Sequence, residues 1–158
     1  MDVGIVLPNG APGVDGPTLL EWARRAEARG FASVGVIGRI AYPTYEELTT
    51  LAAVAGATER VRLLTTTLLA PLRDPVLLAK QAATIDRLSG GRLVLGLSAG
   101  MRPDDFLVTG TSFEGRGKRF DAMLEKITRC GEAIRRVPGR EKRVRSPRTD
   151  AFLSTSVR

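Results

Sequence analysis

Proton transfer by this chain would have to use carboxylates, lysines, tyrosines or water, because its 158 residues include no histidine. Histidine is the commonest general acid or base near neutral pH and the commonest metal ligand. The single cysteine, Cys130, excludes an internal disulfide and a cysteine-rich metal site. We expect Cys130 to be a small apolar contact on a helix. Acid–base chemistry is therefore expected at Asp, Glu, Lys, Tyr or bound water.

A glycine-rich loop follows the first apolar run of the chain and invites comparison with dinucleotide-binding loops. Its glycines are Gly10, Gly13 and Gly16, each separated from the next by two residues. The dinucleotide fingerprint requires G-x-G-x-x-G and an acidic residue at the end of the second strand. Here the second strand is expected to end at Gly38-Arg39, without an acid. Both requirements fail, so we do not expect a Rossmann-type nucleotide site.

The formal charge of +7 is concentrated near the carboxyl terminus. Residues 137–158 contain six basic and two acidic side chains, so they account for more than half of the excess. Such a segment can hold phosphate backbones nonspecifically, but aromatic residues that would stack bases do not interleave with these charges. We therefore expect a disordered or irregular basic tail, and we do not expect a nucleic-acid partner.

Hydrophobic residues make up 43% of the chain, which is ordinary for a globular protein. Apolar runs long enough to cross a membrane are absent from the sequence, and the start MDVGIVLPNG lacks the features of a signal peptide. These observations favour a cytoplasmic protein without a membrane partner.

One stretch predicts a capped helix, a glycine stop and a strand in direct succession. Asp74 can cap the helix, and Pro75 suits the first helical position. The buried stripe of this helix is expected to consist of four apolar residues at helical spacing: Leu78, Ala82, Ile85 and Leu88. After Gly90-Gly91, residues 92–97 predict a strand that is apolar on both faces, as in parallel sheets buried between two layers.

Strand and helix patterns alternate four times along the chain. Strands are expected at 3–7, 33–37, 61–68 and 92–97. Capping-box spacings at Thr18–Glu21 and Thr44–Glu47 predict the starts of two helices. A further helix is expected from Phe120 onward, after a long polar loop. This alternation predicts a parallel sheet with right-handed crossovers.

Four such units are half of the eight that build a (β/α)₈ barrel of about 250 residues. In that fold the active face consists of the loops at the carboxyl ends of the strands. Here those loops are rich in glycine, proline and polar residues: 8–16, 38–43, 66–73 and 98–117. We therefore predict an α/β fold of TIM-barrel type, with a partial barrel domain at 1–136 and a basic tail at 137–158.

The chain resembles the luciferase-like monooxygenase family, the flavin- or deazaflavin-dependent oxidoreductases related to bacterial luciferase. The matching stretches run in the order of the family and cover residues 3 to about 135: VGIVLP, AEARGFASVGVIGR, AAVAGATERVRL, LRDPVLLAKQAATIDRLSGGRLVLGLSAG and FEGRGKRFDAMLE. The resemblance implies a (β/α)₈ barrel that binds FMN or coenzyme F420 over the carboxyl ends of its strands. It also implies hydride transfer, or oxygenation of a small organic substrate by a flavin hydroperoxide.

The same resemblance implies the residues that would contact the cofactor. The end of the third strand would support the face of the ring, often through a non-proline cis peptide near Thr66-Thr67, although threonines also simply suit a strand. The loop Ser98-Ala99-Gly100 would let the backbone approach the ring, or would serve only as a tight turn. Gly38 and Arg39 would complete the list of candidate cofactor-binding residues: Gly38, Arg39, Thr66, Thr67, Ser98, Ala99 and Gly100.

Several positions depart from the family pattern, so the catalytic residues stay unassigned. Many members carry an acid and a histidine where this chain has Gly38-Arg39, and some deazaflavin-dependent members have a glutamate at Met101. Arg39 could bind an anionic substrate, but we expect a solvated arginine. Asp104 and Asp105 are the nearest carboxylates, and we expect them to be solvated as well. Two arginines that precede the fourth predicted helix are expected to pack or to contact its start: Arg116 and Arg119.

Length separates two interpretations of this resemblance. The family binds the cofactor phosphate in loops of the second half of the barrel, and this sequence matches only the first half. One interpretation is an oxidoreductase that acts on a small molecule and forms a homo-oligomer. The alternative is a truncated, non-catalytic half-barrel that oligomerises and does not bind cofactor, because another chain must cover its open edges.

Overall fold

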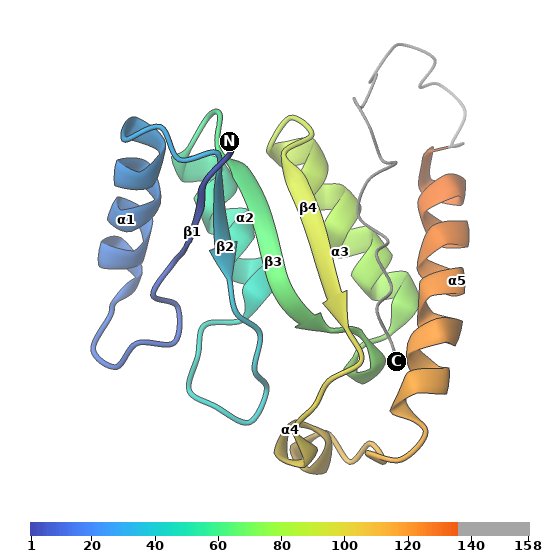
Figure 1. Ribbon diagram of the computed structural model, residues 1–158. Coiled ribbons are helices and arrows are strands. Elements are labelled where there is room, and N and C mark those ends of the chain that lie inside the picture. Colours follow the sequence, from blue (N-terminus) through green and yellow to red (C-terminus); the bar gives the residue numbers. More distant parts are fainter. Residues whose placement is uncertain (136–158) are drawn as a thin grey trace.

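Residues 1–135 are described by the computed structural model, and they form one parallel sheet with helices packed against it (Figure 1). The expectations for residues 137–158 lie outside this part of the chain. The strands are β1 (Gly4–Val6), β2 (Ser33–Val36), β3 (Arg62–Leu69) and β4 (Leu93–Ser98). The helices, with the 3₁₀ turn η1, are α1 (Gly16–Ala28), α2 (Glu47–Ala57), η1 (Ala70–Leu72), α3 (Pro75–Leu88), α4 (Pro103–Val108) and α5 (Arg116–Arg135).

The strands lie in the sheet in the order in which they occur in the chain, β1-β2-β3-β4, and every pair is parallel. A doubly wound sheet reverses its strand order at a switch point, whereas a barrel adds each new strand beside the previous one. The predicted α/β fold of TIM-barrel type, with four βα units, is therefore confirmed. This order of the described strands contains no reversal, so it differs from the Rossmann topology, which the sequence also argues against.

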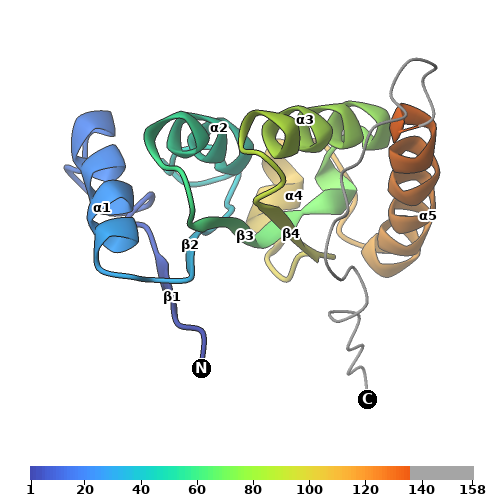
Figure 2. The ribbon, with the colours of Figure 1, turned by 90° about the horizontal axis from the view of Figure 1, so that it is seen from above.

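Helices α1, α2 and α3 cover one face of the sheet, and α5 lies beside α3 (Figure 2). The strand residues that face these helices are fully buried, among them Val34, Val36 and Leu63. The opposite face is different, because the register aligns Val6, Gly35, Leu64 and Val94 in one row across the four strands. Val6 and Val94 in this row are 44% and 41% exposed.

The expectation that strand 92–97 is covered on both faces is therefore wrong for the described residues. Val94 is exposed, and most of β4 is only half-buried. An apolar strand indicates that both faces can be buried, but the described chain supplies a helical layer on one side only. We refer to the other side, which carries Val6, Gly35, Leu64 and Val94, as the open face.

The helix starts differ in detail from the predictions. Asp74 caps α3 as expected, since its carboxylate accepts a hydrogen bond of 2.8 Å from Leu77 N–H. The two capping boxes are wrong: Asp15 caps α1 and Glu46 caps α2. Glu47 is consequently the first residue of α2 rather than its third. Because α2 begins there, Glu47 points into the protein and is buried.

Other parts of the helix predictions also need correction. Leu78, Ala82 and Ile85 are buried in α3 as predicted, but Leu88 in its last turn is 69% exposed. The loop expected at 98–117 contains the short helix α4. Six residues are too few to show a helical repeat, which is why the pattern did not reveal it.

Strands β3 and β4 approach each other very closely at a bulge. The pairing register shifts between Thr65 and Leu68. At this point the buried hydroxyl of Thr65 accepts a hydrogen bond of 2.9 Å from Gly96 N–H and donates one of 3.0 Å to the Gly96 carbonyl. A β-carbon on Gly96 would lie 2.1 Å from the Thr65 carbonyl oxygen. Gly96 is therefore required by the spacing of the two strands.

Candidate active site

The loops that follow the four strands gather at one edge of the sheet, the edge formed by the carboxyl ends of the strands (Figure 1). All seven candidate cofactor-binding residues lie at this edge. Gly38 and Arg39 follow β2, Thr66 and Thr67 lie at the bulge of β3, and Ser98 ends β4. Parallel pairing of β2, β3 and β4 therefore brings together three segments that are distant in the sequence.

Asn9 ties the first two of these loops together. Its side-chain amide donates hydrogen bonds to the carbonyls of Ile37 (2.9 Å) and Tyr45 (3.3 Å), and its Oδ1 accepts one of 3.2 Å from Ile37 N–H. The residue is 3% exposed. Asn9 was not singled out from the sequence, where it is one polar residue within a glycine- and proline-rich loop.

Asp105 on α4 ties the loop after β2 to the loop after β4. Its Oδ1 accepts hydrogen bonds from Ile40 N–H (2.7 Å) and Ala41 N–H (2.9 Å), and its Oδ2 accepts one of 2.8 Å from Arg39 Nε. Arg39 also donates from Nη2 to Asp104 at 3.1 Å. Because Asp105 is 1% exposed, the expectation of a solvated carboxylate is wrong there; Asp104 keeps a side chain that is 42% exposed.

The expectation of a solvated Arg39 is wrong as well. Its side chain is only 19% exposed, and the guanidinium lies over the ring of Tyr42 at 3.9 Å from the centroid. Burial by itself would raise the pKa of Asp105, but the N–H groups of Ala41 and Ile40 and the Arg39 guanidinium outweigh it and hold that pKa below its usual range. Asp105 is therefore an anion that organises the loop.

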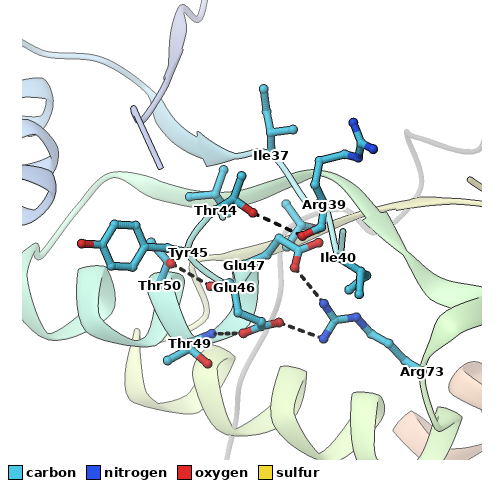
Figure 3. A network of polar contacts seen from close by, with 12 residues as sticks. Ile37, Arg39, Ile40, Thr44, Tyr45, Glu46, Glu47, Thr49, Thr50 and Arg73 are labelled. Atoms are coloured by element: carbon cyan, nitrogen blue, oxygen red, sulfur yellow. Dashed lines mark hydrogen bonds and ion pairs between the residues drawn. The ribbon is translucent and has the colours of Figure 1, made fainter. Parts of the chain in front are cut away.

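A second ion-pair cluster lies beneath the loop after β2 (Figure 3). Arg73, which follows η1, donates from Nη2 to Glu47 (2.7 Å) and from Nη1 to Glu46 (2.8 Å). Glu46 also accepts from Thr49 N–H at 2.7 Å. Arg73 therefore connects the end of the third βα loop to the start of α2.

The two adjacent carboxylates of this cluster have opposite pKa shifts. Burial raises the pKa of Glu47 above its ordinary value, and the attraction of Arg73 offsets this only in part. Burial acts on Glu46 in the same direction, but the N–H of Thr49 and the Arg73 guanidinium outweigh it, so the pKa of Glu46 is lowered. Glu47 is 1% exposed. A group so deeply buried supports the loop and does not contact a ligand on the open face.

Gly38 lies directly against the Glu47 carboxyl group. A β-carbon on Gly38 would be 1.6 Å from Glu47 Oε1. The absence of a side chain at Gly38 therefore lets the strand end rest on the buried acid, a packing role that the sequence did not reveal.

Substitution of Gly38 by alanine should consequently destabilise the protein by about 2 kcal/mol, in the range of overpacked cores. The measurement is urea unfolding of Gly38→Ala beside Gly117→Ala, whose added methyl meets no neighbouring atom within 4 Å. In a Glu47→Ala background the added cost of Gly38→Ala should fall, because the clashing carboxyl is gone. Equal costs in both backgrounds would contradict this packing.

The segment after β4 is held by the start of α5. Ser98 Oγ accepts a hydrogen bond of 3.1 Å from Gly100 N–H, and the Gly100 carbonyl accepts one of 2.9 Å from Arg116 Nε. Arg116 also lies over the ring of Phe113 at 3.9 Å. Gly100 has a φ of +84°, and a β-carbon there would lie 2.8 Å from Phe106. Arg116 is the first residue of α5, and it packs against the loop after β4 rather than capping the helix start.

The end of β3 differs from one expectation. Every peptide bond in the described part of the chain is trans, so the cis bond expected near Thr66-Thr67 is not found. The bulge in β3 occupies this position instead. Thr66 donates from its hydroxyl to the Val36 carbonyl at 2.8 Å, whereas Thr67 is exposed. Thr67 is therefore the threonine of this pair that is accessible to a ligand.

Two negative findings apply to residues 1–135. Within this part of the chain no helix is both long enough and apolar enough to span a membrane. The same residues contain no cluster of three or more histidine, cysteine, aspartate or glutamate side chains placed to bind a metal ion.

A family model described as luciferase-like monooxygenase matches residues 1–150. An uncharacterised protein of Mycobacterium tuberculosis is 32% identical, with 66% of this chain and 44% of that protein covered. An F420-dependent glucose-6-phosphate dehydrogenase of Amycolatopsis mediterranei is 33% identical, with 69% and 35% covered. The crystal structure of the monooxygenase RslO1 from Streptomyces bottropensis matches with a TM-score of 0.70 at 31% identity, covering 82% of this chain and 42% of that one.

This chain therefore spans less than half the length of each of these proteins. The match extends through all four strands, the helices between them and the loops that carry the candidate site residues. The sequence match and the strand order agree with each other. The chain belongs to the luciferase-like monooxygenase family.

Proposed function

We propose that residues 1–135 form the ring-binding half of a flavin- or F420-dependent oxidoreductase that acts on a small organic molecule. One observation supports this most directly: the neighbouring ends of β3 and β4 present small side chains, while buried ion pairs hold the loops behind them. Thr67 is exposed, and Ser98 and Ala99 are half-buried. A flat aromatic ring system requires such an accessible surface with close approach of the backbone.

The residues present at this edge fit the ring of such a cofactor. Thr66, Thr67, Ser98, Ala99 and Gly100 would lie under the ring, because they end β3 and begin the loop after β4. Gly38 and Arg39 would form the rim beside it. When bound, FMN or F420 would supply hydride transfer, and FMN could also activate oxygen.

Acid–base groups on this face are scarce. Asp105 is fully engaged by Arg39 and two backbone N–H groups, and Glu47 is buried. Asp104 and Tyr42 keep exposed surface beside Arg39. We therefore propose that proton transfer, where the reaction needs it, uses Asp104, Tyr42 or water, and that Arg39 holds both groups in position.

Titration of the purified chain with FMN and with F420, followed by cofactor fluorescence, tests the proposal. We expect saturable binding of one cofactor to the wild type and a large loss of affinity in Thr67→Phe, because the bulky ring would occupy the cofactor surface. Thr84→Phe is the matched control, since Thr84 is an exposed threonine on α3 far from the strand ends. Absence of saturable binding of either cofactor, or equal binding by both variants, would reject the proposal.

The second candidate is a non-catalytic half-barrel that forms a homo-oligomer without cofactor. The open face favours it, because Val6 and Val94 remain exposed there in the described part of the chain. This second function predicts a stable oligomer and no affinity for FMN or F420. Measuring the mass in solution together with the cofactor titration separates the two.

A further inference from the structure

Residues 1–135 contain four strands of a fold that closes with eight, and both outer strands of this sheet have one unpaired edge within that region. Strand β1 pairs only with β2, and β4 pairs only with β3. The edge strand of a sheet presents unpaired backbone N–H and C=O groups that can pair with another chain, and native proteins usually cover or protect such edges. We propose that a second copy of this chain closes the sheet, with β4 of each copy pairing in parallel with β1 of the other.

Symmetry makes this pairing possible without any further element. A two-fold axis that runs parallel to the strands preserves strand direction, so β1 of the partner would run parallel to β4. The same axis forms an identical junction between β1 and the partner's sheet, so the assembly closes at two copies rather than growing into a fibre. All helices would remain outside, because α1, α2, α3 and α5 lie on the side of the sheet opposite the open face (Figure 2).

The open face carries apolar side chains of the kind found in a protein interior. Val6, Val94 and Ile37 are 44%, 41% and 47% exposed. Side chains of this kind from both copies would face each other inside an eight-stranded barrel, where branched apolar residues predominate. Closure would therefore remove from water the apolar row that the helices of one copy leave uncovered.

A groove along α1 marks the place where a helix of the partner would lie. It has a volume of about 640 Å³ and is lined by Ile5 on the edge strand and by Trp22, Ala26 and Phe31. Trp22 is 47% exposed. In the closed assembly α5 of the partner would occupy this groove, because α5 follows β4 just as each barrel helix follows its strand. Trp22 would then be buried between two helices.

The charges on the two helices are complementary. Arg25 on α1 and Arg29, which directly follows α1, are exposed and line the groove together with Glu21, which forms an ion pair of 2.8 Å with Arg25. On α5 the exposed acids Asp121 and Glu125 are also four residues apart, and they lie two residues to either side of the buried Met123. At 100° per residue, both acids are on the flank of α5 that faces away from Met123. The two acids of α5 can therefore approach Arg25 and Arg29, whose positive charge Glu21 offsets only in part.

The first test is the mass of the full chain in solution, measured by sedimentation velocity over a dilution series. We expect a dimer of the 17.0 kDa chain without larger species. Val94→Asp should shift it to monomer, because closure would bury an unpaired carboxylate. Val76→Asp is the control, since Val76 is 59% exposed on the outer helix α3 and should leave the dimer intact.

The second test exchanges the charges between α1 and α5. The double variant Arg25→Glu/Arg29→Glu should weaken the dimer at least tenfold, and adding Asp121→Arg/Glu125→Arg to it should restore much of the affinity. Arg24→Glu is the control, because Arg24 is exposed on α1 but does not line the groove. Far-UV circular dichroism of each variant verifies that it remains folded. We expect that it does, because the substituted side chains are exposed.

Specific outcomes would overturn the inference. A monomeric wild type would reject this inference, and the open face would then be covered by another segment or by another protein. A dimer that survives both Val94→Asp and the arginine reversal but is lost in Val76→Asp would place the interface on α3. The outcome is independent of cofactor binding: a monomer that binds FMN would retain the proposed function and reject this inference, and a dimer that binds neither cofactor would do the reverse.

Discussion

Gly96→Ala should lower the free energy of unfolding by about 3 kcal/mol, at the upper end of the range for overpacked sites. The added methyl group would lie 2.1 Å from the carbonyl oxygen of Thr65 and 3.2 Å from that of Thr66. Both atoms belong to the backbone of β3, which cannot move aside as a flexible side chain can. Strands β3 and β4 would have to separate, and the two hydrogen bonds between Thr65 and Gly96 would be lost.

Urea unfolding measures this effect, with Gly56→Ala as the matched control. Gly56 lies in α2, and a β-carbon there meets no atom within 4 Å. Alanine at Gly56 should stabilise the helix by about 0.5–1 kcal/mol. The two glycine-to-alanine changes should therefore have opposite signs. Similar effects at both positions would refute the close approach at the bulge.

Asp105→Ala should be almost as damaging, at about 3 kcal/mol, because it strips partners from a buried cluster. The Arg39 guanidinium and the N–H groups of Ile40 and Ala41 would each lose an acceptor. The loop after β2 should then open, which hydrogen exchange can follow at the amides of Ile40 and Ala41. Cofactor affinity should fall with it if this loop forms the rim of the site.

Asp104→Ala is the control for this variant. Its side chain is 42% exposed and accepts hydrogen bonds from Arg39 Nη2 and from the neighbouring Asp105 N–H, so the loss should stay below about 1 kcal/mol. Equal effects of the two substitutions would show that the buried hydrogen bonds of Asp105 are not the source of its contribution.

The pH dependence of the Asp105 contribution follows from the direction of its shift. The pKa of Asp105 is lowered in the folded state, because backbone N–H groups and Arg39 outweigh burial. Its stabilisation is therefore complete above the pKa of an unfolded aspartate, about 3.9, and disappears as pH falls through the lower folded value. The difference in stability between wild type and Asp105→Ala should accordingly be constant near neutral pH and shrink in acid.

The fold could be predicted from local patterns because each pattern reports burial along one element. Asp74 and the stripe Leu78, Ala82 and Ile85 defined α3, and an apolar run defined β4. Helix α4 was missed, because six residues do not complete two helical turns. Leu88 was assigned wrongly, since helical spacing does not show how far the sheet beneath a helix extends.

The positions of the candidate site residues could be predicted only coarsely. Gly38, Thr66 and Ser98 were expected at the carboxyl ends of strands, and they lie there. The partners of these segments could not be read from the chain: Asp105 lies 66 residues from Arg39. An aspartate in a sequence carries no mark of whether it is solvated or buried, so the supporting role of Asp105 is evident only in the tertiary structure.

By itself, the sequence determined the order of strands and helices, the family, and the edge of the sheet that carries the site. It did so because apolar periodicity, caps and glycine stops are properties of neighbouring residues. Only the tertiary structure decided that Arg39 and Arg73 are held by buried carboxylates, that Gly38 and Gly96 are set by close packing, and that one face of β4 is open. These features arise where segments distant in the chain meet, and a linear pattern does not specify which segments those are.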